Sequence, residues 1–260
     1  MQKETFGRYP KMLQRKWLLP LSGGVLIVAG IACTLLTEGW DSSVPFALSL
    51  IAVVVGLFLI PMGFVKPKNK VNVRTLSMAA LFAALCYVGF TYCKIDIPVG
   101  MEKTAFHLGN VFCVLAALFL GGFWGGMAGA VGMTIADLTT AYVTSAPKTF
   151  LLKLCIGLIT GLVAHKIFHI SQDRERKIPL PVATLISCIA GMAFNVVADP
   201  VVGYFYKMYI LGVPQQAADL WAKMGAVTTL VNAIIAVAAA TVLYTALRKA
   251  MKRTNLMPRL

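Results

Sequence analysis

Long apolar stretches, separated by short polar segments, dominate the chain. A helix that spans a bilayer needs about 20 mainly apolar residues. Eight stretches have that length, and their centres lie near Val25, Val54, Leu81, Val114, Ala130, Leu158, Ile189 and Ile235. The pattern therefore predicts an all-α, polytopic membrane helix bundle with little room for a soluble domain.

A polar, basic break with the sequence KPKNKVNVR separates the first two predicted spans from the other six. Such a change in composition is typical of a boundary between parts of a chain. We therefore expect a first part at residues 1–71, with a cytoplasmic segment and two extra transmembrane helices. A six-helix membrane core follows at residues 72–250, and a basic cytoplasmic tail at residues 251–260.

The stretch LGGFWGGMAGAVGMTIADL, residues 120–138, contains six glycines and one carboxylate. In water each glycine inside a helix costs roughly 1 kcal/mol relative to alanine, whereas in a membrane small residues let helices approach closely. These glycines therefore predict tight packing within the bundle. The connection at Gly121 and Gly122 is so short that the helices on either side are expected to form an antiparallel hairpin at the cytoplasmic face.

Three longer connections, at about residues 94–105, 138–149 and 204–224, are expected on the other side of the membrane. Longer and less regular loops often carry binding residues. The sequence shows no internal repeat, so a secondary transporter built from two related halves gains no support.

The distribution of charge predicts the orientation. The 260-residue chain is 58% hydrophobic, with a mean hydropathy of +0.78 and a formal net charge of +14. Of its 24 basic residues, 18 fall on alternate connections and at the two termini. The positive-inside rule then predicts a multi-pass protein of the cell membrane with both termini in the cytoplasm. Because topology explains these charges, the lipid bilayer is an expected partner and nucleic acid is not.

Motifs that carry chemistry are scarce. The six cysteines show no CxxC spacing and no pairing with histidine, which argues against a zinc site or a disulfide framework. The sequence has no HExxH motif, no P-loop and no dinucleotide fingerprint. We therefore expect no enzymatic activity, no metal and no cofactor, with any ATP used by partner subunits only.

Polar side chains at membrane depth are costly and usually face a cavity or a partner. Here the amides and charges gather toward the outer ends of the predicted helices, whereas the inner halves hold hydroxyls such as Thr160. A pore would need a polar lining throughout, so the pattern predicts a binding cavity that opens to the exterior above a sealed inner half. The candidate substrate-binding residues are His107, Asn110, Asp137, Tyr142, Lys153, Asn195, Asp199 and Asn232.

Structural roles compete with ligand binding at several of these positions. Asp137 and Lys153 are also compatible with an ion pair that closes the bundle, and Tyr142 with an aromatic belt at the membrane interface. Asn195 and Asp199 lie one turn apart on one helix face, which favours this pair as a ligand-facing unit.

The first core helix, SMAALFAALCYV, carries small residues four positions apart. Ala79 pairs with Ala83, and Ala80 pairs with Ala84. Such a surface either packs inside the bundle or docks a separate membrane subunit.

Several of these motifs together resemble a known family. HLGN at a helix start, the glycine-rich hairpin with its Ala-Asp-Leu end, and then Ala-Pro-x-Thr-Phe and a lysine resemble the substrate-binding (S) components of energy-coupling-factor (ECF) vitamin transporters. The segments VVGYFYKMYILG and TLVNAII resemble the fifth and sixth helices of the same family, so the likeness covers about residues 72–250.

The resemblance implies a six-helix membrane protein that binds a vitamin or vitamin precursor near the outer face. It further implies delivery together with a T subunit and two ATPases, with the four alanines docking on the T subunit and the 94–105 loop acting as the substrate gate. Pyridoxine or a hydroxymethylpyrimidine-like compound ranks first as the ligand and riboflavin next, because several hydrogen-bonding residues converge.

Two features depart from that family pattern. The two leading helices, residues 17–65, lie outside the six-helix core, and Asn195 and Asp199 stand where many relatives are more apolar. A solitary, gradient-driven carrier of small molecules and a membrane anchor or sensor protein therefore stay open as alternatives.

Overall fold

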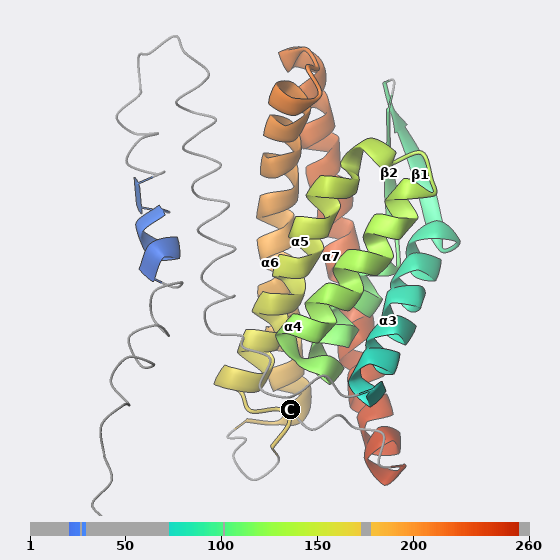
Figure 1. Ribbon diagram of the computed structural model, residues 1–260, viewed down its shortest axis with the longest axis vertical. Coiled ribbons are helices and arrows are strands. Elements are labelled where there is room, and N and C mark those ends of the chain that lie inside the picture. Colours follow the sequence, from blue (N-terminus) through green and yellow to red (C-terminus); the bar gives the residue numbers. More distant parts are fainter. Residues whose placement is uncertain (1–20, 27, 30–72, 101, 173–177, 255–260) are drawn as a thin grey trace, which may run out of the picture. The chain divides into compact units, whose positions relative to one another are not determined.

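The computed structural model describes residues 21–26, 28–29, 73–100, 102–172 and 178–254 (Figure 1). The chain divides into two units, residues 1–66 and 67–260. In the first unit the described residues are helical, and the rest of its two predicted spans lies outside the described residues.

The second unit is a bundle of long helices with one small β-hairpin (Figure 1). Five of its helical segments are long and apolar enough to cross a membrane. The elements are α3 (Val73–Thr91), β1 (Lys94–Val99), β2 (Glu102–His107), α4 (Gly109–Leu138), η1 (Val143–Ser145), α5 (Ala146–Leu162), η2 (Val163–Ile167), α6 (Leu180–Phe205), η3 (Tyr206–Ile210) and α7 (Gln215–Arg253).

Helix α4 supplies two of the six predicted core spans, because it is broken at Gly121. That residue has φ 80° and ψ 171°, a conformation open essentially to glycine only. Beyond it the chain folds back on itself, so that a Cβ added to Gly125 would overlap Ala117 and one added to Gly129 would overlap Cys113. The predicted antiparallel hairpin is confirmed, and with it the six-span core.

Glycine also determines how α5 lies on this hairpin. A Cβ on Gly157 would overlap the backbone of Gly126, and a Cβ on Gly161 would overlap the backbone of Gly122. Backbone against backbone is the closest approach that two helices can make, and lipid tails supply no hydrophobic drive that would replace it. The small residues in the sequence are thus the contact surface between α4 and α5.

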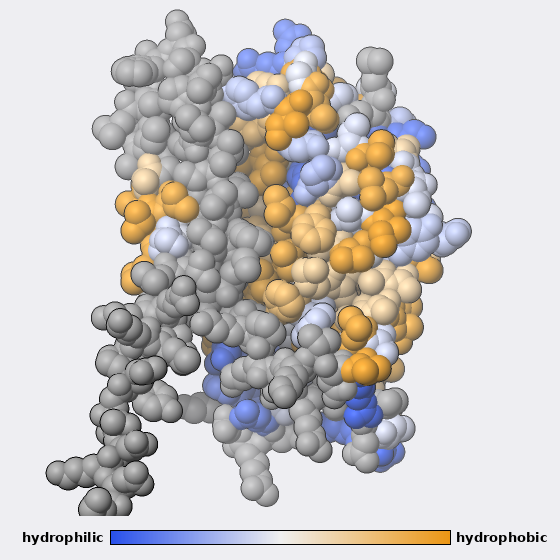
Figure 2. Space-filling view, viewed as in Figure 1, coloured by the Kyte–Doolittle hydropathy of each residue, from blue (hydrophilic) through white to orange (hydrophobic). Residues whose placement is uncertain are grey.

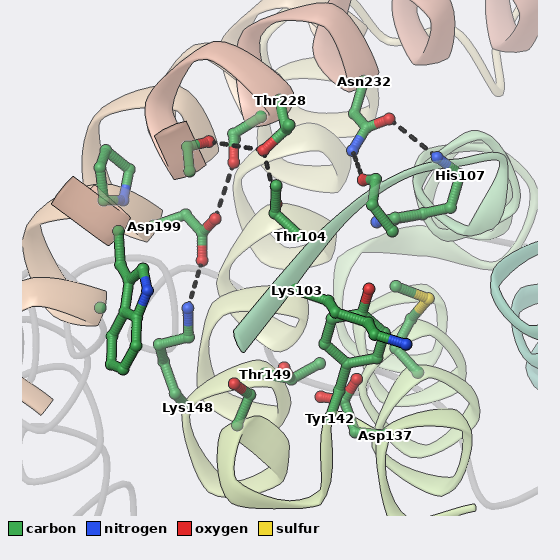
Figure 3. A pocket seen from close by; sticks show the side chains of 18 of the residues that line it. Lys103, Thr104, His107, Asp137, Tyr142, Lys148, Thr149, Asp199, Thr228 and Asn232 are labelled. Atoms are coloured by element: carbon green, nitrogen blue, oxygen red, sulfur yellow. Dashed lines mark hydrogen bonds and ion pairs between the residues drawn. The ribbon is translucent and has the colours of Figure 1, made fainter. Parts of the chain in front are cut away.

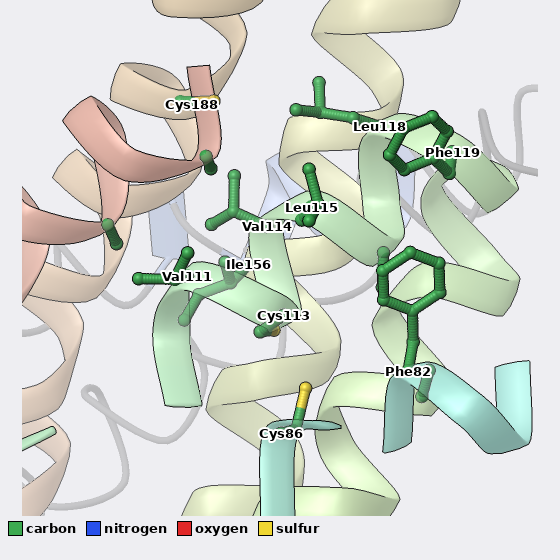
Figure 4. Close-up of a cluster of buried hydrophobic side chains, with 14 of the residues drawn as sticks. Phe82, Cys86, Val111, Cys113, Val114, Leu115, Leu118, Phe119, Ile156 and Cys188 are labelled. Atoms are coloured by element: carbon green, nitrogen blue, oxygen red, sulfur yellow. The ribbon is translucent and has the colours of Figure 1, made fainter. Parts of the chain in front are cut away.

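The bundle is filled by apolar side chains from α3, α4, α5, α6 and α7. Figure 4 shows the cluster, with Phe82 and Cys86 of α3 facing the first half of α4, and Ile156 and Cys188 beside it. Phe82 stacks on Phe119 with ring centroids 6.0 Å apart. On the face seen in Figure 2, hydrophobic residues cover the middle of the described bundle and hydrophilic ones gather toward its two ends, as expected for a protein that crosses a bilayer.

Two of the expected loops are more regular than the sequence predicted. Residues 94–107 form the antiparallel β1–β2 hairpin, in which Lys94 pairs with His107 and Val99 with Glu102. The turn passes through Gly100, with φ 62°. Between α6 and α7 the helical turns extend so far that only residues 211–214 are not helical. Strand pairing, which a local sequence pattern does not show, supplies the backbone hydrogen bonds of the first segment, and helical hydrogen bonds supply those of the second.

At the end of the bundle opposite the hairpin, a cluster of buried polar side chains links helices and loops by hydrogen bonds. Arg248, only 5% exposed, donates from Nη2 to the carbonyl oxygen of Ile170 at 2.5 Å. The His165 ring lies 3.1 Å from the carbonyl oxygen of Ala117 through Nε2 and 2.6 Å from Ser171 Oγ through Nδ1. A carbonyl can only accept, so Nε2 donates to Ala117. The sequence pattern did not reveal this cluster.

Candidate functional site

A cavity of about 140 Å³ lies under the β1–β2 hairpin, between the ends of α4, α5, α6 and α7 (Figure 3). This is about ten times the volume that holds one buried water. Its polar and aromatic lining consists of Phe90, Lys103, Thr104, His107, Asp137, Tyr142, Ser145, Lys148, Thr149, Lys153, Asp199, Lys207, Trp221, Thr228, Thr229 and Asn232.

The structure brings six of the eight candidate residues together around this cavity: His107, Asp137, Tyr142, Lys153, Asp199 and Asn232. Asn110 and Asn195 are not among its lining residues. They are 2% and 1% exposed, and the Oδ1 atom of each lacks a hydrogen-bond partner within the described residues. Asn195 thus lies one helical turn before Asp199 on α6 and outside the cavity lining.

Asp199 accepts hydrogen bonds from two other helices at the cavity. Its Oδ1 accepts from Lys148 Nζ at 2.8 Å, and its Oδ2 accepts from Thr229 Oγ1 at 2.7 Å, so the carboxylate joins α5, α6 and α7 (Figure 3). Sequence reasoning missed Lys148 and Thr229 as site residues. Lys148 is the variable position of the Ala-Pro-x-Thr-Phe motif, which was the available signal.

Asp137 and Lys153 do not form an ion pair in the part of the chain that the structure describes. Asp137 is 2% exposed and its Oδ2 has no hydrogen-bond partner there. Lys153 is 6% exposed, and its Nζ makes no hydrogen bond or ion pair with the described residues. Buried polar groups in proteins are nearly always paired, so two such groups beside one cavity mark it as a place for a ligand or water.

His107 ends strand β2 and turns its ring toward the cavity. Burial, reinforced by the nearby positive charge of Lys153, lowers the pKa of His107 to about 3, so the imidazole is neutral near pH 7. The ring meets Phe90 edge-on, with centroids 4.7 Å apart, and its Nδ1 has no hydrogen-bond partner among the described residues. A neutral Nδ1 can donate or accept, depending on the tautomer.

The hairpin is held over the cavity by side chains of α7. Trp221 Nε1 donates to the carbonyl oxygen of Val99 at 2.7 Å, and Thr104 and Thr228 share a hydrogen bond of 2.8 Å between their hydroxyls. Asn232 Oδ1 accepts from the His107 backbone N–H at 3.0 Å, and Asn232 Nδ2 donates to the carbonyl oxygen of Ala105 at 2.9 Å (Figure 3). In this structure the Asn232 amide therefore binds the hairpin backbone.

Tyr142 secures the other side of the hairpin. Its hydroxyl donates to Asp96 Oδ1 at 2.9 Å, and Lys94 lies both on Asp96, at 3.2 Å, and over the Tyr142 ring, 4.9 Å from its centroid. Burial and the adjacent carboxylate raise the pKa of Tyr142 well above its usual range, so the hydroxyl remains a donor. A neutral donor suits the Asp96 carboxylate, which can only accept.

The four alanines of α3 divide between two faces. Ala79 is buried at 7% exposure, and Ala83 packs where a Cβ on Gly132 would overlap its backbone. Ala80 and Ala84 are exposed, on a stripe that also carries the apolar side chains of Val73, Leu76, Leu81 and Val88. A partner helix on α3 would therefore meet Ala80 and Ala84 and not the other two.

Among the described residues, no three His, Cys, Asp or Glu side chains are grouped so as to hold a metal ion. Residues 70–249 match the family described as ECF-type riboflavin transporter, S component. No curated protein and no solved structure matches the chain.

Proposed function

The chain belongs to the ECF-type riboflavin transporter S component family, and we propose that it captures a flavin-type vitamin at the outer face of the membrane. The observation that carries this proposal is the cavity under the hairpin, beside which Asp137 Oδ2 and His107 Nδ1 are buried without a partner in the described part of the chain. Polar atoms left unsatisfied beside a cavity are the atoms a ligand would satisfy.

The character of these atoms supports a flat heterocycle as the ligand. A carboxylate accepts, and a neutral imidazole either donates or accepts. A ring edge that alternates N–H and C=O groups, as in a flavin, offers a partner to both. We therefore rank riboflavin first, following the description of the matched family, and keep pyridoxine and hydroxymethylpyrimidine as the next candidates.

We further propose that the ligand enters from outside the cell and that both chain termini are cytoplasmic. The support is the alternation of basic residues along the chain, together with the location of the cavity at the end of the bundle opposite Arg248 and Lys249. A T subunit and two ATPases would then supply the energy, since the chain contains no P-loop of its own.

Thermal stabilisation of the purified protein, in detergent and without partners or ATP, tests the binding proposal. A ligand that binds only the folded chain raises its melting temperature by mass action. We expect riboflavin to raise it, and Asp137→Asn to weaken the response by about tenfold in concentration. The matched control is Asp219→Asn, at an exposed aspartate of α7 outside the cavity. No response to any B vitamin from folded, ligand-free protein would reject the proposal.

Partner docking has its own test. Ala84→Trp places a bulky ring on the exposed stripe of α3 and should prevent co-purification with the T subunit of the same host, while ligand binding stays intact. The control is Ala246→Trp, at an exposed alanine of α7. Equal co-purification of both variants would remove α3 as the docking surface, and vitamin uptake that persists without the T subunit and ATPases would favour a solitary carrier.

A further inference from the structure

The charges around the cavity do not balance. Four lysines line it, Lys103, Lys148, Lys153 and Lys207, against two aspartates, Asp137 and Asp199. A neutral vitamin such as riboflavin would leave this formal excess of positive charge unchanged. Salt screens charges at a buried position less than charges on an exposed surface, so the buried lysines of this lining matter most.

The lysines differ in what they contact. Lys148 pairs with Asp199 at 2.8 Å, and Lys207 lies over the Trp221 ring, 4.0 Å from its centroid. Lys103 is exposed on β2. Lys153 alone among the four combines burial, at 6% exposure, with an ammonium that has no hydrogen bond or ion pair to the described residues.

A buried ammonium is stable only with an anion or several acceptors around it. Both carboxylates of the cavity attract the Lys153 ammonium from a distance, but neither forms an ion pair with it: Asp199 is engaged directly by Lys148 and Thr229, and Asp137 lies beyond ion-pair distance. Within the described residues the Lys153 ammonium therefore has no acceptor in direct contact, and an anionic group of a ligand would supply one.

We infer that the preferred ligand carries an acidic group, a carboxylate or a phosphate, and that Lys153 binds it. This inference rests on the proposed function, because it concerns the ligand of the same cavity. Asp137 would then accept from an N–H or O–H group elsewhere on the ligand, so that the two charged side chains distinguish the two ends of one molecule.

Pairs of ligands that differ in one acidic group test this directly. Isothermal titration with the full-length protein would compare riboflavin with riboflavin 5′-phosphate, pyridoxine with pyridoxine 5′-phosphate, and pyridoxine with 4-pyridoxate. The first two pairs report on a phosphate and the third on a carboxylate. We expect the acidic member of at least one pair to bind about tenfold or more tightly, as one charge-assisted contact provides.

Two variants then show which lysine is responsible. Lys153→Met keeps a side chain of similar length without the charge and should reduce the preference to within about twofold, while Lys103→Met, at the exposed rim, should leave most of it. A preference that survives Lys153→Met, or that disappears only in Lys103→Met, would overturn the role given to Lys153.

The comparison of the ligand pairs uses the unmodified protein, so its outcome does not depend on whether any variant folds. Equal or tighter binding of every neutral member would overturn the inference and leave the proposed function standing. Binding of no member of any pair would count against the proposed function itself, and the two failures are thereby distinguished.

Discussion

At the scale of single residues, the cavity combines satisfied and unsatisfied polar groups. Asp199 is held by Lys148 and Thr229, so replacing it leaves two donors without an acceptor and disturbs three helices at once. Asp137 Oδ2 and His107 Nδ1, by contrast, have no hydrogen-bond partner among the described residues. Loss of ligand binding after a change at Asp199 would therefore mix structural damage with lost contact, whereas Asp137 reports on the ligand more directly.

His107 predicts a pH dependence of stability. It lies outside the membrane-spanning helices, and its pKa is about 3 in the folded chain against an ordinary 6.5. Above pH 6.5 the ring is neutral in both states; below it, the unfolded chain takes up a proton that the folded chain excludes, so stability falls as the pH drops from 6.5 toward 3. We expect the change between pH 7.5 and 4.5 to be about 1–2 kcal/mol smaller in His107→Gln than in the parent protein.

Unfolding in a graded series of denaturing detergent, at both pH values, measures that difference. The comparison between parent and variant removes the contribution of the carboxylates, which titrate in both. Identical slopes with pH would mean that His107 is solvated and that its ring does not lie in the cavity as described.

At the scale of elements, the β1–β2 hairpin is held by Tyr142 on one side and by polar contacts to α7 on the other. Trp221, Thr228 and Asn232 supply these contacts, and they lie along one side of that helix. Polar contacts of this kind are individually worth only about 0.5–1.5 kcal/mol. We therefore expect these contacts to break at a lower cost than those of the apolar core beneath the hairpin.

Trp221→Phe tests the hairpin contact. The change keeps an aromatic ring but removes the donor to Val99, and we expect a bound ligand to dissociate about fivefold faster, as loss of roughly 1 kcal/mol implies. Trp124→Phe, on α4 against Phe123, is the matched control. Dissociation followed by dilution of labelled ligand gives the rate, and equal rates for the two variants would show that this hydrogen bond does not hold the hairpin.

The packing around two glycines predicts that the same glycine-to-alanine change lowers the stability at one position and raises it at the other. Gly157→Ala places a Cβ into the backbone of Gly126, which has no flexible end that can move away, and should cost about 1–3 kcal/mol or more. Gly225→Ala in α7 has nothing within 4 Å and should gain about 0.5–1 kcal/mol from a better helix propensity. Melting temperatures of the two purified variants test this, and a shift of the same sign in both would contradict the close α4–α5 contact.

At the scale of the whole molecule, the described lining of the cavity comes from the second unit. The lining residues that the structure describes run from Phe90 to Asn232, and the division between the two units falls at residues 66 and 67. The unit also contains the complete six-span core. Ligand binding is thus expected to be a property of this unit.

Deletion of residues 1–66 should leave the affinity for the ligand within about twofold of the full chain. Titration calorimetry on both forms, after a check that the shorter chain is monodisperse, makes the comparison. If the shorter chain is folded but does not bind, the first unit contributes to capture. If binding is retained, the two leading helices serve a step other than capture.

The sequence by itself determined the membrane bundle, its six core spans and the hairpin at Gly121. The length of an apolar segment and the spacing of small residues are local properties of the sequence. In a bilayer the first determines where helices span, and the second determines where helices approach closely. It also placed the polar residues at one end, because depth in the membrane follows from position along each span. Six of the eight candidate residues meet at the cavity for this reason.

Tertiary structure decided which face of each helix is buried and which distant side chains form contacts, because local sequence patterns do not contain this information. Rotation of each helix determined that Asn110 and Asn195 turn away from the cavity lining and that Ala79 and Ala83 face the bundle, since a shift of one position changes the face by about 100°. It paired Asp199 with Lys148, 51 residues earlier, and left Lys153 without a partner in the described chain. Such choices depend on which side chains meet across helices, and that is settled only when all the helices pack together.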